Sequence, residues 1–306
     1  MSSPSRLRLG SAGPLPAGDR TETHPVAQAT DTGRPDTGNQ ETGADRAAGP
    51  SALACFGDFI AALAGRRPAL FLDYDGTLVP LAPRPELAVL DEAVRGTIRR
   101  LSALCPVAVV SGRDLDDVAR MVGLEGLVYA GSHGFDIRGP GLRTQIGQEY
   151  LGELEGADID LRARLAAIPG TLVERKRFAI AIHTRQVAPP DKPAVAAVVR
   201  SVAAERAQLR VTGGKEILEL RPNLPWDKGR AVLTLLDALG LSGEGTVPLY
   251  LGDDETDEDA FRALSGRGFG IRVGDDTSGT AAQWRLRDPA EAARFLDRLA
   301  GRLAGS

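Results

Sequence analysis

Cysteine and long apolar runs are both scarce in this chain of 306 residues. The two cysteines, Cys55 and Cys105, are too few for a disulfide framework and lie in apolar sequence, so we expect buried free thiols in a reducing cytoplasm. No apolar stretch reaches the ~20 residues that a transmembrane helix needs, and no signal-peptide core lies near the start. We therefore expect a cytoplasmic location and no membrane partner.

An excess of charge is missing as well. The net charge of −4 gives no reason to expect a nucleic acid as partner. The hydrophobic fraction of 42% and the charged fraction of 25% are those of an ordinary soluble protein. We expect a small-molecule substrate, and a monomer is the simplest expectation for the oligomeric state.

Lysine is scarce among the basic residues: four of the 37 are lysine and the rest are arginine. Three of the four, Lys176, Lys215 and Lys228, fall inside the motifs described below, whereas Lys192 lies in a proline-rich loop. A compact ammonium fits where a planar guanidinium is too large or too rigid, so the two cations are not interchangeable. We therefore predict that the first three lysines belong to a site.

Residues 1–50 are rich in glycine, proline, serine, threonine and aspartate and contain hardly any large apolar side chains. Such a segment cannot bury enough surface to fold, so we predict a disordered tail without a function, His24 included. Acidic residues such as Asp19, Glu22 and Asp31 argue against an organelle transit peptide.

The rest of the chain alternates predicted strands and helices. This alternation predicts an α/β fold, with a parallel sheet and helices on both of its faces. Between 143 and 219 the pattern changes to α+β, which predicts a cap domain inserted into a core formed by 51–142 and 220–306. The predicted elements are helices over 52–64 and 87–104, through 118–121, 195–202 and 295–299, and strands at 69–72, up to 111, and at 127–130, 178–183, 217–220, 247–251 and 269–273.

Two carboxylates follow the first predicted strand. Asp73 and Asp75 stand two positions apart, before a turn marked by Gly76 and Thr77. This arrangement suits phosphoryl transfer through an aspartyl-phosphate, in which Asp73 attacks phosphorus while a divalent cation screens the charge repulsion. Asp75 would protonate the departing alcohol and then help to deprotonate water. The alternative is a strand that runs into an ordinary acidic turn.

Later strands also end in polar residues. The hydroxyl of Ser111 can donate to a phosphoryl oxygen, and Lys228 can supply a fixed positive charge to the nucleophile and the phosphoryl group. Alternatively, Ser111 and Asp114 only cap a helix, and Lys228 is an exposed lysine at a helix start.

Six acidic residues occur within 253–259, directly after an apolar strand. They would repel one another without a cation, and hard oxygen ligands of this kind suit Mg²⁺. Asp253 and Asp254 are the better metal candidates, because Glu258 and Asp259 also fit the acidic first turn of a helix.

In this order the motifs resemble those of the haloacid dehalogenase superfamily, and more particularly the trehalose-6-phosphate phosphatase family. The resemblance covers the chain after about residue 66 and implies a Rossmann-like core of the haloacid dehalogenase type with an α+β cap. The closer family is indicated by the runs Gly131-Ser132-His133-Gly134, Glu174-Arg175-Lys176 followed by His183 and Arg185, and Gly214-Lys215 followed by Glu219, Arg221 and Pro222.

The resemblance also implies roles for individual residues. Asp73 would be the nucleophile, Asp75 the acid and base, and Ser111 and Lys228 the phosphate ligands. Mg²⁺ would be held by the carboxylates of Asp73 and Asp253 and the main-chain carbonyl of Asp75. Asp254 and Asp257 would lie behind these ligands. The substrate-binding residues would be Gly112, Arg113, His133, Glu174, Lys176, Arg185, Lys215 and Glu219.

Strand parity tests part of this substrate-binding set. Lys215 and Glu219 fall on one side of a strand, but parity does not put Glu174 and Arg185 on the same side. Either 174–177 is already a turn or one of the assignments is wrong. The alternative for all of them is solvated charge on a small sheet, and His183 fits a structural role equally well, so it is not included.

The resulting hypothesis is Mg²⁺-dependent hydrolysis of trehalose 6-phosphate, the last step of trehalose biosynthesis. Other cap-bearing phosphatases, acting on sucrose phosphate or a glycosyl-phosphoglycerate, are the nearest alternative. A catalytically silent sensor of phosphosugars is a further one, although it would not need both Asp73 and Asp75.

Overall fold

The computed structural model describes residues 49–214, 216–275 and 279–305. The predicted tail, except for Gly49 and Pro50, lies outside the described residues, as do His24 and Lys215. Both cysteines are free thiols, with Cys105 buried and Cys55 half-buried.

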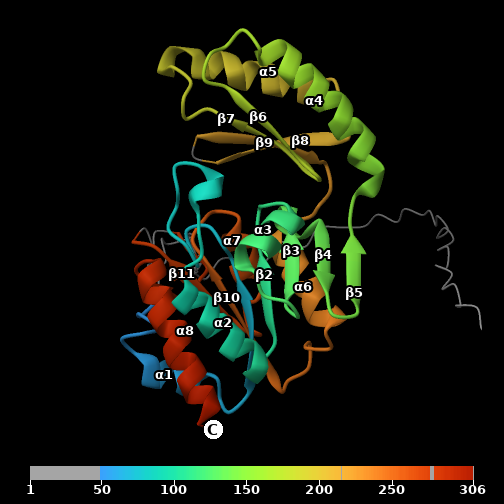
Figure 1. The fold of residues 1–306 in the computed structure, drawn as a ribbon. Helices are drawn as coiled ribbons and strands as arrows, with labels where there is room; N and C mark the ends of the chain where they lie inside the picture. The colour runs from blue at the N-terminus through green and yellow to red at the C-terminus, as the bar shows by residue number, and fades with distance from the viewer. Residues whose placement is uncertain (1–48, 215, 276–278, 306) are drawn as a thin grey trace, which may run out of the picture. The chain divides into compact units, whose positions relative to one another are not determined.

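A sheet of eight strands forms the centre of the core (Figure 1), in the order β12-β11-β10-β1-β2-β3-β4-β5. The first six of these are parallel, and β4 and β5 extend the sheet as an antiparallel hairpin. The strands are β1 (Arg67–Leu72), β2 (Val107–Val110), β3 (Val128–Gly131), β4 (Asp136–Gly139), β5 (Leu142–Gln145), β10 (Thr246–Gly252), β11 (Phe269–Val273) and β12 (Trp284–Leu286).

Helices cover both faces of this sheet, so the predicted α/β class is confirmed. The central strands are apolar on both sides; all four residues of β2, for example, are buried, as expected for parallel strands between two layers of helices. One face packs against α1 (Phe56–Ala62), α2 (Glu92–Leu104), α3 (Leu115–Val122) and α8 (Pro289–Ala304), and the other against α6 (Lys228–Ala238) and α7 (Asp257–Ala263).

The helix predicted over 87–104 begins later than expected. The side chain of Asp91 accepts a hydrogen bond from the amide of Ala93 and thereby caps α2, which starts at Glu92. Leu87 belongs instead to a short 3₁₀ turn, Pro85–Leu87, and is exposed. Leu87 has helical spacing from the apolar residues of α2, but it lies before the residue that caps the helix, so the predicted start was too early.

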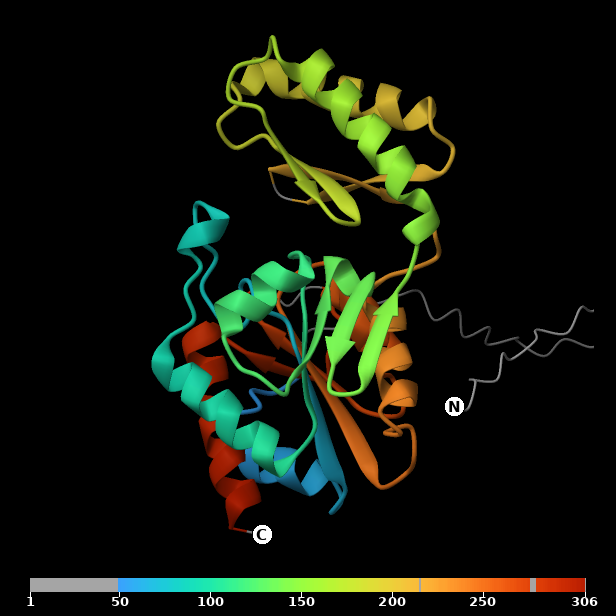
Figure 2. The ribbon, with the colours of Figure 1, turned by 45° about the vertical axis from the view of Figure 1, so that its right-hand side comes forward.

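A second sheet of four antiparallel strands, in the order β6-β7-β9-β8, lies in the inserted segment. Two helices, α4 and α5, cover one face of it (Figure 2), where they bury the apolar side chains of the strands. The opposite face carries charged residues. The elements are α4 (Leu151–Leu165), β6 (Leu172–Lys176), β7 (Ala179–His183), α5 (Lys192–Ala204), β8 (Leu209–Gly214) and β9 (Ile217–Pro222).

The ends of the two sheets differ slightly from the predicted cap, 143–219. Residues 143–145 belong to β5 of the large sheet, and 220–222 belong to β9 of the small sheet. Three of the cap's elements, α4, β6 and β8, were not predicted. The strands β6 and β8 mix charged residues and glycine with few apolar ones, so their alternation is weak.

None of the helices in the described part of the chain is long and apolar enough to cross a membrane.

We predict that Leu161→Ala lowers the free energy of unfolding by about 2–5 kcal/mol, because it leaves a cavity between α4 and the small sheet. Ile159→Ala, two residues earlier on the same helix but 61% exposed, is the matched control and should change it by less than about 1 kcal/mol. Urea unfolding followed by circular dichroism measures both. Equal effects would contradict the packing assigned to α4.

Candidate active site

The candidate site lies where the parallel strands of the large sheet end. Asp73 follows β1, Ser111 follows β2, and Asp253 follows β10, while Lys228 is the first residue of α6. Because β10, β1 and β2 are neighbours with parallel register, their carboxyl ends meet at one edge of the sheet, where open α/β sheets bind ligands.

A buried lysine joins two of the acidic residues. The ammonium of Lys228 donates to Asp73 Oδ1 at 2.9 Å and to Asp257 Oδ1 at 2.7 Å, and its side chain is 2% exposed. Burial acts to lower the pKa of Lys228, but the charges of Asp257 and Asp73 outweigh it and raise this pKa well above its usual value. Lys228 therefore stays protonated, and it is not the exposed lysine of the alternative interpretation.

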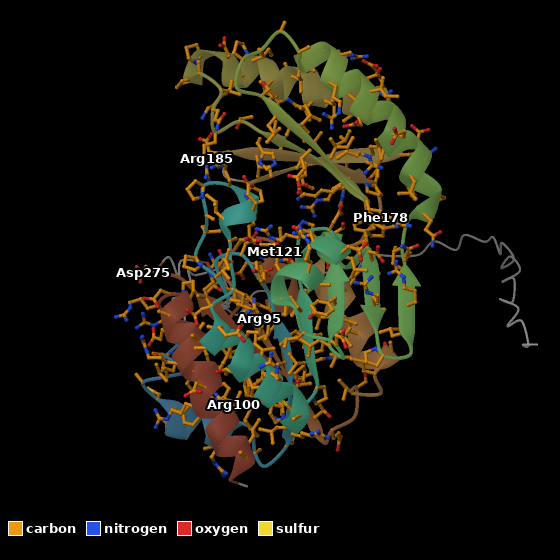
Figure 3. The ribbon with its side chains drawn as sticks, viewed as in Figure 1. Arg95, Arg100, Met121, Phe178, Arg185 and Asp275 are labelled. Carbon is orange, nitrogen blue, oxygen red and sulfur yellow. The ribbon has the colours of Figure 1, made fainter. Side chains whose placement is uncertain are left out.

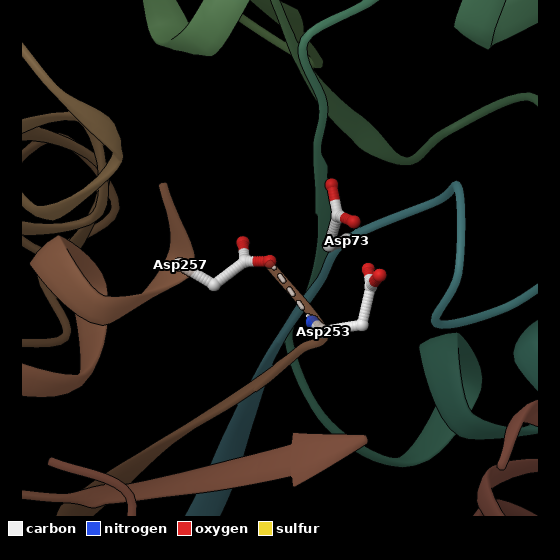
Figure 4. Close-up of side chains that lie close together, drawn as sticks. All are labelled: Asp73, Asp253 and Asp257. Carbon is white, nitrogen blue, oxygen red and sulfur yellow. Dashed lines mark hydrogen bonds between the residues drawn. The ribbon is translucent and has the colours of Figure 1, made fainter. Parts of the chain in front are cut away.

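Asp257 is fixed from four directions. Its Oδ1 accepts from Lys228 and from the hydroxyl of Tyr250 at 2.6 Å, and its Oδ2 accepts from the amides of Asp253 at 2.9 Å and Asp254 at 3.0 Å. Figure 4 shows the bond to the amide of Asp253. These donors use most of the acceptor capacity of the carboxylate, so Asp257 is suited to hold the end of β10 in place.

Three carboxylates lie close enough to share a cation. Asp73, Asp253 and Asp257 each offer an oxygen, and these oxygens lie within 4.8 Å of one another. A set of carboxylate oxygens is what Mg²⁺ prefers, so the residues fit this ion. Because four donors already use most of the acceptor capacity of Asp257, Asp73 and Asp253 are the better candidates for direct ligands. A contribution from the main-chain carbonyl of Asp75 stays a prediction.

The loop after β1 leaves room for Asp253 only because it contains Gly76. Gly76 has a φ of +80°, and a Cβ atom there would lie 2.1 Å from Oδ2 of Asp253. The next residue, Thr77, donates its hydroxyl to Oδ1 of Asp253 at 3.2 Å. The Gly-Thr turn is therefore part of the carboxylate cluster and is more than a chain reversal.

The buried carboxylates of this cluster repel one another. Burial, together with the charges of Asp257 and Asp254, raises the pKa of Asp253 to about 7, against the opposing charge of Lys228. Burial also raises the pKa of Asp257 to about 6 and raises that of Asp73, against the opposing charge of Lys228. A single ammonium does not balance this cluster, so an additional cation is favoured.

Asp75 is held by an arginine. Its carboxylate accepts two hydrogen bonds from Arg113, from Nε at 2.6 Å and from Nη2 at 2.7 Å. The remaining donors of the guanidinium go to Asp117 at 3.1 Å and to the carbonyl of Pro85 at 3.0 Å. Arg113 is therefore occupied within the protein, and its predicted contact with the substrate stays a prediction.

The run Gly131–Gly134 places His133 against the loop after β2. Ser132 and His133 have φ values of 49° and 56°, a conformation that costs on the order of 1–3 kcal/mol per non-glycine residue. The amide of His133 donates to the carbonyl of Ser111 at 2.8 Å. Gly112 is needed here, because a Cβ atom would lie 2.8 Å from the His133 ring.

His133 is buried, with 9% of its side chain exposed, and its Nδ1 has no hydrogen-bond partner among the described residues. Burial, together with the charge of Arg221, lowers the pKa of His133 to about 4, against the opposing effect of Glu219. The imidazole is therefore neutral at neutral pH, and Nδ1 is available to a polar group.

The charged face of the small sheet gathers around Glu219. Its Oε1 accepts from Lys176 at 2.9 Å, its Oε2 accepts from Nε of Arg221 at 2.8 Å, and His133 Nε2 lies 3.4 Å from Oε2. Lys176 also donates to the carbonyl of Gly112 at 3.3 Å. Burial acts to raise the pKa of Glu219, but Lys176, His133 and Arg221 hold it well below its usual value. The alternative of solvated charges does not fit these residues.

The strand-parity argument about Glu174 and Arg185 was wrong because a hairpin turn lies between these residues, and the alternation of faces does not continue through a turn. Glu174 lies within β6, opposite Ala181 of β7, and cross-strand partners point to the same face. The His183 ring, which was left out of the prediction, lies 2.8 Å from the Glu174 carboxylate. Arg185 follows the end of β7 and donates to the carbonyl of Pro83 in the core at 3.2 Å (Figure 3).

Three further residues were missed. Tyr250 lies in an apolar strand and was assigned no role, although its hydroxyl near the carboxyl end of that strand could have indicated a site residue. Arg221 appears in a quoted motif without a role, and its alternation with Glu219 was the signal that was overlooked. Asp114 was taken only as a helix cap, and its actual contacts come from residues that are distant in sequence.

The chain is similar to proteins of known family. A family model described as trehalose-phosphatase matches residues 71–290. Probable trehalose-phosphate phosphatase D of Arabidopsis thaliana is 38% identical, over 97% of this chain and 80% of that protein. Trehalose 6-phosphate phosphatase RA3 of Zea mays is 42% identical, over 83% and 75%. The solved structure of a trehalose-6-phosphate phosphatase related protein aligns with a TM-score of 0.69 and 27% identity, over 78% of this chain and 99% of that one.

We predict that Mg²⁺ binding to the protein without substrate weakens as the pH falls. With a pKa of about 7, Asp253 is mostly ionised at pH 8 and mostly protonated at pH 6, and a proton competes with the metal. For one displaced proton the apparent affinity falls about tenfold between these values. Isothermal titration calorimetry measures it. Asp253→Asn is the control and should bind weakly at both values; an affinity of the wild type that does not change with pH would contradict the assignment.

Proposed function

The chain belongs to the trehalose-phosphatase family, and from this premise we propose that it hydrolyses trehalose 6-phosphate to trehalose and phosphate, the last step of trehalose biosynthesis. The observation that carries the proposal is the buried Asp73 carboxylate held by Lys228 beside Asp253, together with the charged face of the small sheet. The earlier identification of this family from the motifs is confirmed.

Asp73 is the proposed nucleophile. Lys228 holds Oδ1, so we assign the attack to Oδ2. A bond forms between this oxygen and phosphorus while the bond from phosphorus to the sugar oxygen breaks, which gives an aspartyl-phosphate and the free sugar. The fixed ammonium of Lys228 stabilises the charge on the phosphoryl group, and the hydroxyl of Ser111 donates to one of its oxygens.

Asp75 is the proposed acid and base. In the first step it gives its proton to the sugar oxygen, and in the second it takes a proton from the water that attacks the aspartyl-phosphate. Arg113 holds the Asp75 carboxylate in an ion pair, with Nε 2.6 Å from Oδ2. The ion pair has to loosen before Asp75 can carry a proton to the leaving group.

A divalent cation completes the proposed chemistry. Asp73 and Asp253 would hold Mg²⁺, which offsets the repulsion between the nucleophile and the phosphate when it is bound. Asp257 and Asp254 act behind them: Asp257 fixes the end of β10, and the Asp254 carboxylate accepts from the amides of Thr256 and Asp257.

The charged face of the small sheet is the proposed sugar site. Hydroxyl groups leaving water need charged hydrogen-bond partners, and this face supplies two carboxylates and an ammonium. The neutral His133 offers Nδ1 as an acceptor for a hydroxyl. The proposed set is Glu174, Lys176, Arg185 and Glu219 with His133, and Lys215 is proposed from the sequence alone.

The cytoplasmic location and the monomeric state stay predictions. Burial raises the pKa of the Cys105 thiol to about 11, so this thiol is unreactive near neutral pH, in keeping with a buried thiol in a reducing compartment.

The test of the proposal is phosphate release in the presence of Mg²⁺ from trehalose 6-phosphate, sucrose 6-phosphate and glucose 6-phosphate. A strong preference for the first, abolished by a chelator, supports both the core chemistry and the sugar site. Release from a different ester would keep the core chemistry and contradict the sugar site. Release from none of them would favour the silent sensor.

Asp73→Asn should lower kcat by on the order of 10³-fold or more, because an amide is a poor nucleophile. The side chain keeps its size, so the circular dichroism spectrum should not change. Single-turnover phosphate release measures the effect. Substantial residual hydrolysis by the pure variant would contradict the aspartyl-phosphate mechanism.

Glu219→Ala should lower kcat/KM for trehalose 6-phosphate far more than for para-nitrophenyl phosphate, by about 10- to 100-fold in the ratio, because only the sugar ester needs a charged partner. Glu205→Ala is the matched control, since Glu205 is an exposed carboxylate of the same segment and pairs with Arg164. Equal losses on the two substrates would remove Glu219 from the sugar site.

A further inference from the structure

The tip of the β6–β7 hairpin is seated on the core. Phe178 is fully buried, and its ring stacks on that of Phe135 with centroids 5.9 Å apart and an interplanar angle of 17° (Figure 3). The Phe135 ring lies 6.2 Å from that of Trp226. A tip residue from the small sheet therefore completes an aromatic cluster of the core.

Asp114 contributes the polar part of this contact. Asp114 directly precedes α3, at the position where an aspartate usually caps a helix, yet its side chain makes no cap hydrogen bond. Both of its carboxylate oxygens accept from the amide of Arg177 at 2.9 Å, and Oδ1 also accepts from the hydroxyl of Ser132 at 2.8 Å. The Asp114 carboxylate therefore binds the hairpin tip instead of capping its own helix.

The residues beside Asp114 connect the tip to the chemistry. Gly112 accepts from the ammonium of Lys176, and Arg113 holds the carboxylate of Asp75. One short loop therefore contacts the proposed acid on one side and two consecutive residues of the hairpin tip on the other. The ammonium of Lys176 also donates to Glu219 Oε1 at 2.9 Å, so Lys176 connects the hairpin tip to Glu219.

We propose that Asp114 is a positioning residue that seats the β6–β7 tip on the loop after β2 and thereby sets the preference for a sugar ester over a small ester. The proposal rests on the proposed function. Lys176 and Glu219 reach the substrate in the correct place only when the tip is seated. A small ester needs only the proposed core residues Asp73, Asp75, Ser111 and Lys228 with the metal, so its hydrolysis does not depend on the tip.

Asp114→Ala removes both acceptors of the Arg177 amide, and Asp114→Asn keeps one oxygen for it. Asp116→Ala is the matched control, because Asp116 lies two residues away and its side chain is 85% exposed, paired with Arg138. The measurements are kcat/KM for trehalose 6-phosphate and for para-nitrophenyl phosphate, and hydrogen exchange of the Arg177 amide in the full chain without substrate.

For Asp114→Ala we expect kcat/KM for trehalose 6-phosphate to fall about 10- to 100-fold, the size of one lost charge-assisted hydrogen bond, with less than about a threefold change for para-nitrophenyl phosphate. Exchange at Arg177 should become faster by a similar factor. Asp114→Asn should recover much of both losses, and the control should resemble the wild type.

Equal losses on the two esters, or unchanged exchange at Arg177, would overturn the proposal. If Asp114→Ala does not fold, Asp114→Asn and Phe178→Leu carry the same comparison, and a loss confined to the sugar ester supports it. A wild type that releases no phosphate from trehalose 6-phosphate contradicts the proposed function only. The exchange result still decides whether Asp114 seats the tip, because it needs no substrate.

Discussion

The arrangement of the site depends on one buried ammonium. Lys228 joins Asp73, at the end of β1, to Asp257, at the start of α7, and Asp257 in turn binds the amides at the end of β10. Without Lys228, buried carboxylates would face one another with no compensating charge, a costly state in a low-dielectric interior. The same residue thus sets the position of the proposed nucleophile, Asp73, and compensates the charge of the acidic cluster.

Much of the core was predictable from the sequence because parallel strands impose a simple geometry. Asp73, Ser111 and Asp253 each follow an unbroken apolar run, and neighbouring parallel strands bring their ends together. The scarcity of lysine drew attention to Lys228 for a physical reason, since only a compact ammonium fits between two carboxylates in a closed space.

The remaining features depend on contacts that no local pattern encodes. Glu174 and His183 meet only because a two-residue turn reverses the chain between their strands. Arg113 was predicted to contact the substrate, but its guanidinium binds Asp75 and the carbonyl of Pro85, which lie 38 and 28 residues earlier in the chain. Asp114 has the sequence position of a helix cap, but its carboxylate binds the β6–β7 hairpin. In each case the tertiary packing determines which of several possible contacts the side chain makes.

The buried ring of Phe178 has a consequence for recombination between related phosphatases. Joining points placed after β5 and after β9 leave both sheets whole, and by strand pairing alone the inserted segment looks like a unit that can be exchanged. The aromatic cluster does not follow this border, because the ring of Phe178, in the turn of the small sheet, packs on that of Phe135. A grafted segment therefore has to bring a hairpin tip that matches its new host, so compatibility depends on the few residues of that tip.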